Sequence, residues 1–593
     1  MSRILRHKSI LSFLIAFTLA VAFTGGSAAA ASARSASSNN SPLCKNLNKN
    51  FWGSSGMQMW CFGPQPNGPG NALKSMPSSP KSGGGFSTNV DAANPAEDVS
   101  PSGVQAFGQS ETSIAATGPY AVEAWNDASG FFSQCGAPMN KEEGTGFGFS
   151  ADGGATFTDE GGVPNANCNS ALYGGDPSVE AWSPGGTPYF YISSLYNPVF
   201  TSFPPPESRS FIALDACKAT GTGSSSLLTC SSRPIIVATS SQCMNFGNGF
   251  FSCSFLDKDF MSIDPVRGRL YMSFTEIFFN FRTGRETFII ELAVCDIGTA
   301  TGGTGSAGGT AGAPVCFNDS RGSQQSPAPP YMTVAPNDVH GCENEGAYPA
   351  VDLATGDVYV AYEHNVTSFF VSSTCESLPT QEVVDYIPFK CLPLAPQSAC
   401  ARPTATNGLS ITSLAAAFIP GYNRFPMNDF PRIAVSDPAG TVSIVWNDAR
   451  FNPSGDILMQ SFNLASLTGV QTAPVVINSS TGGWHFLPGL RNADANGNLN
   501  ISFYSRSSAN TAVTDVVVAV AVNPTTTSTP INLVATDVSS DWNSVSSDIV
   551  PNFGDYTDTY VIATPSAPFT GTTVYASWSD GRLGDPQPFE AHT

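Results

Sequence analysis

The chain has 593 residues and a formal net charge of −20, and only 12% of its residues are charged. Because nucleic acids are bound by basic surfaces, a chain this acidic is expected to have no nucleic-acid partner. The 56 glycines and 45 prolines favour an all-β protein of many short strands joined by turns.

The first 31 residues have the pattern of a secretory signal peptide. Basic residues within the first eight precede an apolar stretch over residues 10–23, and small residues follow, with cleavage expected near Ala29 to Ala33. The apolar stretch is too short to span a membrane, and no later stretch is long enough. We therefore expect a secreted, extracellular protein without a transmembrane segment.

Two segments have the composition of flexible chain. Residues 32–84 are rich in Ser, Gly and Pro and predict a mobile leader with one small loop closed by Cys44 and Cys61. Gly302 to Gly312 is also Gly-rich but lies between β segments, so it predicts a surface loop. Residues 85–593 are then expected to form one folded domain.

The 14 cysteines favour disulfide bonds, since their number is even and the chain is expected to be exported. Each cysteine has a close neighbour in the sequence, so we predict that neighbours pair. The predicted pairs are Cys44/Cys61, Cys135/Cys168, Cys217/Cys230, Cys243/Cys253, Cys295/Cys316, Cys342/Cys375 and Cys391/Cys400.

An internal repeat is the strongest structural signal in the sequence. Each unit has an acidic or polar lead-in, a short apolar strand, a turn, and a second strand rich in Val, Tyr and Trp. The seven units start at Glu111, Asp176, Asp257, Glu343, Asn428, His485 and Gly554.

The turns inside the units predict hairpins, because Asp, Asn and Gly supply the backbone angles that tight turns need. With a third and a fourth strand, each unit becomes a propeller blade, and the ring must close because one blade cannot bury both faces. We therefore predict a single seven-bladed β-propeller of four-stranded antiparallel blades. The last unit is one strand short, so a segment around Phe86 to Asp91 is expected to complete it. A tandem of β-sandwich domains explains the strands but not the recurring pattern.

Two motifs resemble those of sialidases. The segment FSADGGATF, with Ser150, Asp152, Gly154 and Thr156, matches the Asp box, which in that family is a turn between the outer strands of a blade. The W-x-D endings add to the resemblance: Trp125–Asp127, Trp446–Asp448 and Trp578–Asp580. Roughly residues 86–593 thus resemble the Asp-box (BNR-repeat) β-propeller superfamily. Sialidases have six blades, so six is the alternative to seven.

The resemblance implies a candidate sialidase chemistry. Sialidases hold the substrate carboxylate with three arginines and use a tyrosine nucleophile, a glutamate and an acid/base aspartate. The nearest counterparts here are Arg432, Arg491, Asp555 and Tyr556. A third arginine and the partner glutamate cannot be assigned, and Glu111 stands where an arginine motif would open the first blade.

The lead-in positions supply a carboxylate in six of the seven units, and in a propeller these positions lie near one mouth of the axis. They are Glu111, Asp176, Asp259, Glu345, Asp429 and Asp555, with His485 in the sixth unit. One interpretation is that each carboxylate fixes the turn into its strand. The other is that Glu111, Asp176 and Asp259 bind a cation, for which oxygen ligands favour Ca²⁺.

The same mouth suggests a sugar site. Glu345 and Asp429 come from adjacent units and form the candidate acid and base of a glycoside hydrolase. We expect Tyr348 and Trp484 to flank the mouth and stack on a sugar ring, with His485 and Arg491 as further substrate ligands; core packing is the alternative role for the aromatic residues. The negative field favours neutral or cationic ligands over an anionic sugar.

Three functions follow from the sequence. The first is a secreted, monomeric propeller that binds a carbohydrate or another extracellular polymer at its axial mouth. The alternative is a glycoside hydrolase with exo-sialidase-like activity. A second alternative is an extracellular interaction scaffold without a ligand.

Overall fold

The computed structural model describes residues 85–97, 107–132, 143–198, 207–221, 223–241, 243–247, 250–280, 285–316, 332–335, 343–366, 381–394, 409–412, 419–423, 430–509, 512–549, 551–562 and 572–593. All of them belong to one compact unit, Arg34–Thr593. The predicted signal peptide, the predicted leader and the Cys44/Cys61 pair lie outside the described residues.

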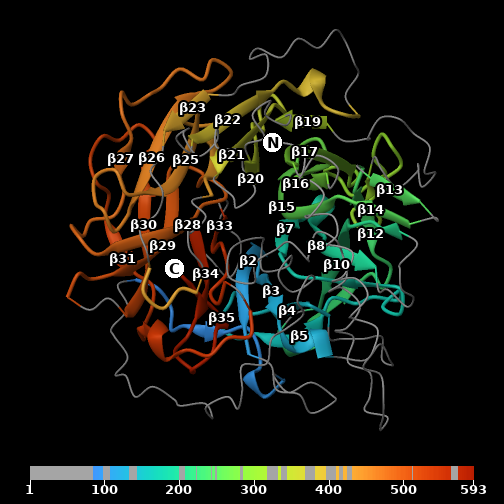
Figure 1. Ribbon diagram of the computed structural model, residues 1–593, viewed down its shortest axis with the longest axis horizontal. Helices are drawn as coiled ribbons and strands as arrows, with labels where there is room; N and C mark the ends of the chain where they lie inside the picture. Colours follow the sequence, from blue (N-terminus) through green and yellow to red (C-terminus); the bar gives the residue numbers. More distant parts are fainter. Residues whose placement is uncertain are drawn as a thin grey trace, which may run out of the picture. The chain divides into compact units, whose positions relative to one another are not determined.

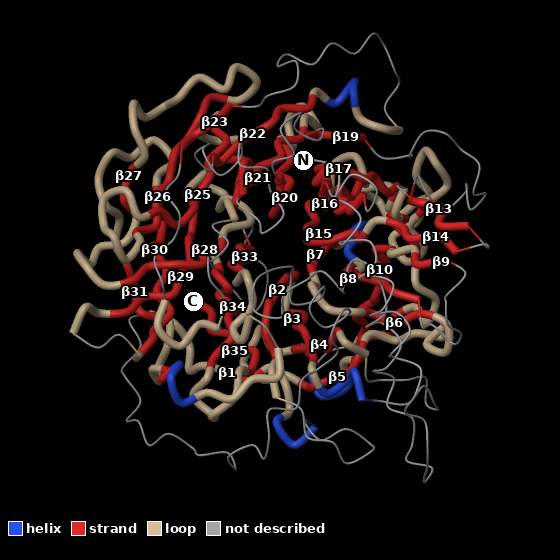
Figure 2. The backbone as a smooth tube through the Cα atoms, viewed as in Figure 1, coloured by secondary structure: helices blue, strands red, loops and turns tan. Residues whose placement is uncertain are grey.

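The described residues form seven antiparallel sheets, each with a four-stranded blade at its centre, arranged around a common axis (Figure 1). The predicted seven-bladed propeller is confirmed. Helical structure in the described part of the chain is limited to single 3-10 turns: Pro95–Glu97, Ser129–Phe132, Pro184–Gly186, Gly223–Ser225, Phe389–Cys391 and Trp542–Ser544 (Figure 2). None of these turns has the length or hydropathy that crossing a bilayer requires.

The first four blades follow one another along the chain, each starting with its innermost strand. Blade 1 contains β2 (Gln109–Thr117), β3 (Tyr120–Asp127), β4 (Thr145–Ser150) and β5 (Thr158–Gly162). Blade 2 contains β7 (Ser178–Trp182), β8 (Tyr189–Pro198), β10 (Phe211–Thr220), β11 (Leu227–Cys230) and β12 (Ile235–Thr239), with β6 (Ala171–Tyr173) beside β8. Blade 3 contains β15 (Phe255–Asp264), β16 (Arg269–Asn280), β17 (Arg285–Asp296), β18 (Val315–Cys316) and β19 (Met332–Ala335). Blade 4 contains β20 (Glu343–Val351), β21 (Val358–Val366), β22 (Gln381–Ile387) and β23 (Leu409–Thr412).

Blades 5 to 7 complete the ring. Blade 5 contains β24 (Arg432–Ser436), β25 (Thr441–Asp448), β26 (Asp456–Asn463) and β27 (Val475–Val476). Blade 6 contains β28 (Trp484–Gly489), β29 (Leu499–Arg506), β30 (Val513–Val522), β31 (Asn532–Val534) and β32 (Ser540–Asp541). Blade 7 contains β33 (Asp558–Ile562), β34 (Thr573–Asp580), β35 (Gln587–His592) and β1 (Val90–Asp91). A separate small sheet contains β9 (Glu207–Ser208), β13 (Cys243–Gly247) and β14 (Phe250–Cys253).

The ring closes between the two ends of the propeller. Strand β1 pairs antiparallel with β35, so that Val90 lies opposite Glu590 and Asp91 opposite Phe589. The prediction that the segment before the first unit completes the last blade is confirmed. Further hydrogen bonds extend the closure on both sides of β1, between Ser87 and His592 and between Ala92 and Pro588.

The hydrophobic core lies between the blades rather than inside them. One cluster, for example, joins Phe190 and Ile192 of blade 2 to Val122 and Phe147 of blade 1. Another joins Trp446 of blade 5 to residues of blade 4. Among the described residues, every pair of neighbouring blades shares such a cluster. Each blade therefore depends on both neighbours to bury its faces, as expected for a closed ring.

Aspartates fix the hairpin turns between the first and second strands of several blades. The carboxylates of Asp264, Asp352 and Asp494 each accept two backbone N–H groups of their own turn, at 2.8–3.0 Å. Neighbouring turns are also joined, because Arg267 of blade 3 donates to the carbonyl of Leu353 in blade 4 at 3.1 Å. The turn residues that mark the hairpins in the sequence thus also connect the blades.

The segment that matches the Asp box forms a turn between β4 and β5, the two outer strands of blade 1. Asp152 accepts the backbone N–H of Thr156 at 2.9 Å and its hydroxyl at 2.7 Å. Ser150 donates to Asp152 at 2.9 Å and accepts the N–H of Gly154 at 2.9 Å. Side chains therefore satisfy the backbone of this turn locally.

The W-x-D endings form a recurring buried contact. In blade 7, Asp580 accepts the indole N–H of Trp578 at 2.8 Å and the guanidinium of Arg582 at 2.7 Å. Blade 5 repeats this arrangement with Trp446, Asp448 and Arg450. The motif is therefore a device that fixes the end of the second strand in these two blades.

Three disulfides are described, and all three are predicted sequence neighbours: Cys217–Cys230, Cys243–Cys253 and Cys295–Cys316. Each joins two adjacent antiparallel strands at directly opposite positions. Cys168 and Cys391 are also disulfide-bonded, and their predicted partners lie outside the described residues. The other pairs remain predictions.

The Gly-rich loop of blade 3 is wrapped around one carboxylate. Asp296 accepts backbone N–H groups from Gly298, Ala307 and Gly309. A Cβ atom on Gly309 would lie 1.9 Å from the carbonyl oxygen of Asp296, so only glycine allows this approach. The high glycine content of this loop, which predicts a flexible segment, instead allows the backbone to approach Asp296 closely.

We expect Gly309→Ala to lower the free energy of unfolding by about 1–3 kcal/mol, because the added methyl group must push the loop away from Asp296. Urea denaturation measures the change. The matched control is Gly312→Ala, whose Cβ would meet Tyr189 at an ordinary 3.4 Å. Equal stability of both variants would show that the contact at Gly309 is unimportant.

Candidate functional site

Four charged side chains meet at the end of the axis where the innermost strands begin, and we call them the axial cluster: Lys258, Glu111, Asp176 and Asp555. The Lys258 ammonium donates to Glu111 Oε1 at 3.0 Å and to Asp555 Oδ2 at 2.8 Å. Asp176 Oδ2 lies 3.4 Å from the same nitrogen. Because blades 3 and 7 are not neighbours, a contact between Lys258 and Asp555 is made across the axis. All four side chains are buried.

The backbone explains why these residues point to the axis. Glu111, Asp176 and Lys258 have φ angles of 56°, 56° and 55°, in the left-handed region that non-glycine residues rarely adopt. The strand pairing is interrupted at Glu111, between Ser110 and Ser113, and again at Lys258. Such bulges redirect a side chain out of the sheet. The lead-in residues of these blades are thereby turned toward one another.

Burial and mutual repulsion change the ionisation of the axial cluster. Burial, together with the neighbouring Asp176, raises the pKa of Glu111 to about 8, although Lys258 opposes this change. Burial alone would lower the pKa of Lys258, but the three carboxylates raise it well above its usual value. The cluster therefore holds one ammonium among three carboxyl groups, of which Glu111 carries a proton near neutral pH.

One step further along the innermost strands lies an arginine held by aromatic rings, the Arg432 cage: Arg432, Phe260, Tyr348 and Tyr556. The guanidinium carbon lies 4.8, 4.5 and 5.3 Å from the three ring centres, respectively. Its Nε donates to the carbonyl of Pro488 at 3.2 Å. Burial lowers the pKa of Arg432. Cation–π contacts of this kind stabilise the charge in a dry interior.

The next layer contains Arg491, which joins three further blades. It donates to Asp558 Oδ2 at 2.5 Å, to Glu180 Oε1 at 3.1 Å and to Ser113 Oγ at 2.9 Å. Burial raises the pKa of Glu180 to about 7, and Arg491 limits this rise. The segment that leads into β33 therefore contributes to all three groups. Asp555 belongs to the axial cluster, Tyr556 to the Arg432 cage, and Asp558 binds Arg491. Both arginines that the sialidase resemblance implies as substrate ligands are engaged by the protein itself.

A cavity of about 390 Å³ follows at the ends of the innermost strands, and we call it the strand-end cavity. Six of the seven blades contribute to its wall. The wall includes Glu180 and Arg491 from the layer above, Tyr560 and Asn492, and apolar residues such as Val351 and Val435. Asp437 and Asp494 add two more carboxylates. This cavity therefore lies at the mouth opposite the one that the sequence pointed to.

The other sequence-predicted residues do not join the axial cluster. Asp259 is buried next to Ser193, and burial raises its pKa well above the usual value. Trp484 and His485 are the first residues of β28, and His485 is bound by Ser480 at 2.6 Å at the boundary with blade 5. Glu345 is buried and stands opposite Glu363 in the strand pairing. Asp429 lies outside the described residues, so its pairing with Glu345 stays a prediction.

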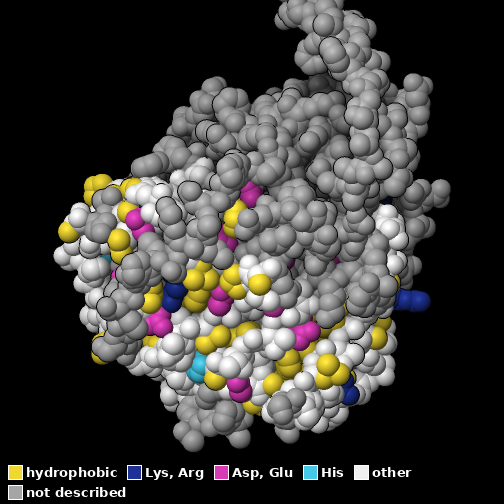
Figure 3. All heavy atoms as spheres, turned by 90° about the horizontal axis from the view of Figure 1, so that it is seen from below, with side chains coloured by type: hydrophobic (Ala, Val, Ile, Leu, Met, Phe, Trp, Pro, Cys, Tyr) yellow, Lys and Arg dark blue, Asp and Glu magenta, His cyan; other side chains and the backbone are white. Residues whose placement is uncertain are grey.

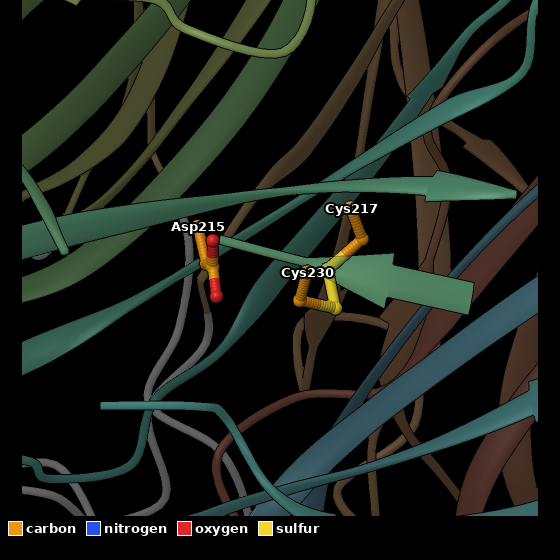
Figure 4. Close-up of side chains that lie close together, drawn as sticks. All are labelled: Asp215, Cys217 and Cys230. Atoms are coloured by element: carbon orange, nitrogen blue, oxygen red, sulfur yellow. A yellow bond between two sulfur atoms is a disulfide. The ribbon is translucent and has the colours of Figure 1, made fainter. Parts of the chain in front are cut away.

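The metal prediction meets an obstacle in this geometry. Two of the three predicted ligands, Glu111 and Asp176, surround the Lys258 ammonium, which Ca²⁺ would have to displace. In the described ranges, one group of potential metal ligands comes together: Asp215, Cys217 and Cys230 (Figure 4). Its two sulfur atoms form a disulfide, so no thiolate is free to bind a metal.

Sequence reasoning missed the residue at the centre of the axial cluster, Lys258, and two residues of the cavity, Glu180 and Asp437. Lys258 occupies the lead-in position of blade 3, next to Asp259, which was chosen because the other lead-in residues are acidic. The sequence signal that could have identified it is the spacing to the strand. Lys258 lies three positions before Met261, just as Glu111 and Asp176 lie three positions before Ile114 and Val179. No local sequence pattern identifies Glu180 and Asp437. They line the same cavity only because the ring brings blades 2 and 5 together.

Comparisons with known proteins give structural likenesses and no sequence matches. Neither a protein-family model nor a curated protein matches the chain. The α-L-arabinofuranosidase of Fusarium graminearum with arabinobiose is 10% identical, with a TM-score of 0.35, over 76% of this chain and 97% of that one. The Trypanosoma rangeli sialidase with the inhibitor DANA is 10% identical, with a TM-score of 0.34, over 84% and 73%. A Hadza microbial sialidase is 9% identical, with a TM-score of 0.32, over 75% and 68%. Sialidases are thus among the matched structures, as the resemblance implied, but likenesses this distant say nothing about activity.

Proposed function

We propose that the protein is a secreted propeller that binds a carbohydrate or another extracellular polymer, and that the ligand enters the strand-end cavity. The observation that carries the proposal is the composition of this cavity, whose wall combines hydrogen-bonding side chains with apolar ones. Carbohydrate sites need both, since sugar rings present hydroxyl groups at their edges and C–H groups on their faces. The disulfides support an extracellular location.

The charges of the cavity favour a neutral or cationic ligand. Its wall holds three carboxyl groups, and its single arginine is already paired with Asp558. An anionic sugar would be repelled by this arrangement. Acidic side chains are also distributed over the face of the unit that Figure 3 shows, in keeping with the net charge.

The rim of the cavity adds an apolar surface. Leu353, in the wall, is 37% exposed, and Val266, next to the wall residue Pro265, is 59% exposed. Large exposed side chains that gather beside a cavity are typical of binding sites. A polymer chain that leaves the cavity would contact both residues.

Binding to a glycan array, followed by titration calorimetry on the best neutral glycan, tests the proposal. We expect Asn492→Ala to weaken binding about 10- to 100-fold, because the Asn492 amide donates to the carbonyl of Val561 at 2.7 Å and accepts its N–H at 3.0 Å, and so fixes the wall of the cavity between blades 6 and 7. Asn523→Ala is the matched control, since Asn523 is an exposed turn residue outside the cavity. Equal loss in both variants, or a glycan whose binding ignores Asn492, would contradict the proposed site.

A glycoside hydrolase is the second candidate, and the ionisation of Glu180 favours it. A carboxyl group with a pKa of about 7, facing a cavity, is suited to act as a general acid. Asp437, in the same wall, would serve as the base. A panel of fluorogenic glycosides distinguishes the candidates: turnover lost in Asp437→Asn supports hydrolysis, and binding without turnover supports the first proposal.

A further inference from the structure

Lys258 and Asp555 form a buried ion pair whose amine and carboxyl groups could also form a covalent bond. Their nitrogen and oxygen atoms are 2.8 Å apart, and both side chains are fully buried. The faces of Phe430 and Tyr556 lie 5.6 and 5.2 Å from the nitrogen. A lysine nitrogen hydrogen-bonded to a carboxyl group in a buried site brings a nucleophile and an acyl acceptor together.

Glu111 holds the two reacting residues together. Its Oε1 accepts from the Lys258 ammonium at 3.0 Å and from the backbone N–H of Asp555 at 2.9 Å. One carboxyl oxygen thus keeps the lysine nitrogen beside the residue that it attacks. Such a contact promotes a reaction by positioning its partners.

The acceptor carboxyl group is also polarised. The hydroxyl of Tyr422 shares its proton between the carbonyl of Gly554 at 3.0 Å and Asp555 Oδ1 at 3.2 Å, and Asp555 Oδ2 faces Lys258. Oδ1 is the oxygen that gains negative charge when the nitrogen attacks the carbon, so this hydrogen bond stabilises the transition state. Asp176 is farther from the nitrogen, at 3.4 Å. Asp555 is therefore the better placed acceptor.

We propose that Lys258 and Asp555 condense into an isopeptide bond that joins blades 3 and 7 across the axis. One proton of the ammonium moves along the 2.8 Å hydrogen bond to Asp555 Oδ2, which leaves a neutral amine and a carboxylic acid. The Nζ–Cγ bond then forms, the bond between Cγ and one carboxyl oxygen breaks, and one water molecule leaves. The reaction changes no oxidation state and needs no cofactor.

Burial makes the first proton transfer accessible. The surrounding carboxylates hold the pKa of Lys258 high, so the amine does not form by losing a proton to solvent. Within a dry ion pair, however, the two charges lack hydration, and transfer between the partners removes both charges at once. The bond is therefore expected to form slowly after folding.

Peptide mapping of the folded, full-length protein tests the proposal. We expect a tryptic peptide that contains Lys258, linked to one that contains Asp555, with a combined mass lower by one water. Trypsin is also expected to leave the chain uncut after Lys258, because an amidated lysine is not a cleavage site. Separate, unmodified peptides from protein aged for days would overturn the proposal, and so would a link from Lys258 to Asp176 or Glu111.

Two variants separate the chemistry from the folding. Lys258→Arg keeps the positive charge but replaces the amine, so the link should disappear while the propeller stays folded. Glu111→Gln keeps the size of the side chain but loses the charge that holds the Lys258 nitrogen beside Asp555, and the link should form about 100-fold more slowly. A native rate in Glu111→Gln would overturn the assigned role of Glu111. The proposal does not depend on the ligand of the strand-end cavity.

Discussion

Replacing Lys258 with methionine is expected to lower the free energy of unfolding by about 3–5 kcal/mol. The substitution leaves three carboxyl groups, those of Glu111, Asp176 and Asp555, packed together without their counter-charge. Removing one partner of a buried ion pair costs this much because the remaining charge stays desolvated. Urea denaturation followed by tryptophan fluorescence measures the change.

The matched control for this prediction is Lys218→Met. Lys218 is exposed, and substitutions of exposed side chains usually change stability by less than about 0.5 kcal/mol. If Lys258→Met cost no more than this control, the axial cluster would not contribute to the stability of the ring.

Stability is expected to fall as the pH rises from about 5 to about 8. The pKa values of the buried Glu180 and Glu590 are raised to about 7, mainly by burial. Between about pH 4.5 and 7 the folded protein keeps protons that the unfolded chain has released. The stability that these protons contribute is therefore complete below about pH 4.5 and is lost as the pH rises toward 7. The difference between a pKa of 4.5 in the unfolded chain and one of about 7 in the folded protein corresponds to about 3 kcal/mol for each group. Urea denaturation at several pH values measures the slope.

A single variant isolates one part of this pH dependence. In Glu590→Gln the titrating group is lost while its size is kept, so the slope between pH 5 and 8 should decrease. Glu590 lies in β35 opposite Val90 of the closing strand, which makes the ring closure sensitive to pH. A stability that rose over this pH range would contradict the raised pKa values.

The fold could be predicted because its signals are local and repeated. The acidic turn at Asp352, the alternation along the strands and the W-x-D ending at Trp578 each describe part of one blade, and repetition of the blade implies the ring. Even the completing strand at Val90 follows from counting, since the last unit is one strand short. None of these steps needs knowledge of contacts between distant residues.

The candidate site could be predicted only in part, because it depends on contacts across the ring. The sequence singled out Glu111, Asp176 and Asp555 from their lead-in positions, and the structure brings these three together. The sequence also predicted Asp259 as a member of this group. In the structure the pairing of β15 with β16 shifts between Asp257 and Phe260, and Lys258 points to the axis instead. Arg491 was expected to meet a ligand, but Asp558 binds it from another blade, and no local pattern reveals such a partner.

The pairing of β1 with β35 has a consequence for the biogenesis of the protein. Among the described strands, β1 precedes all others in the sequence and its partner β35 follows them, so the ring cannot close until residue 592 has been synthesised. Before that point blade 7 lacks the pairing that joins its two ends. Folding of the complete ring is therefore expected only after β35 has been made.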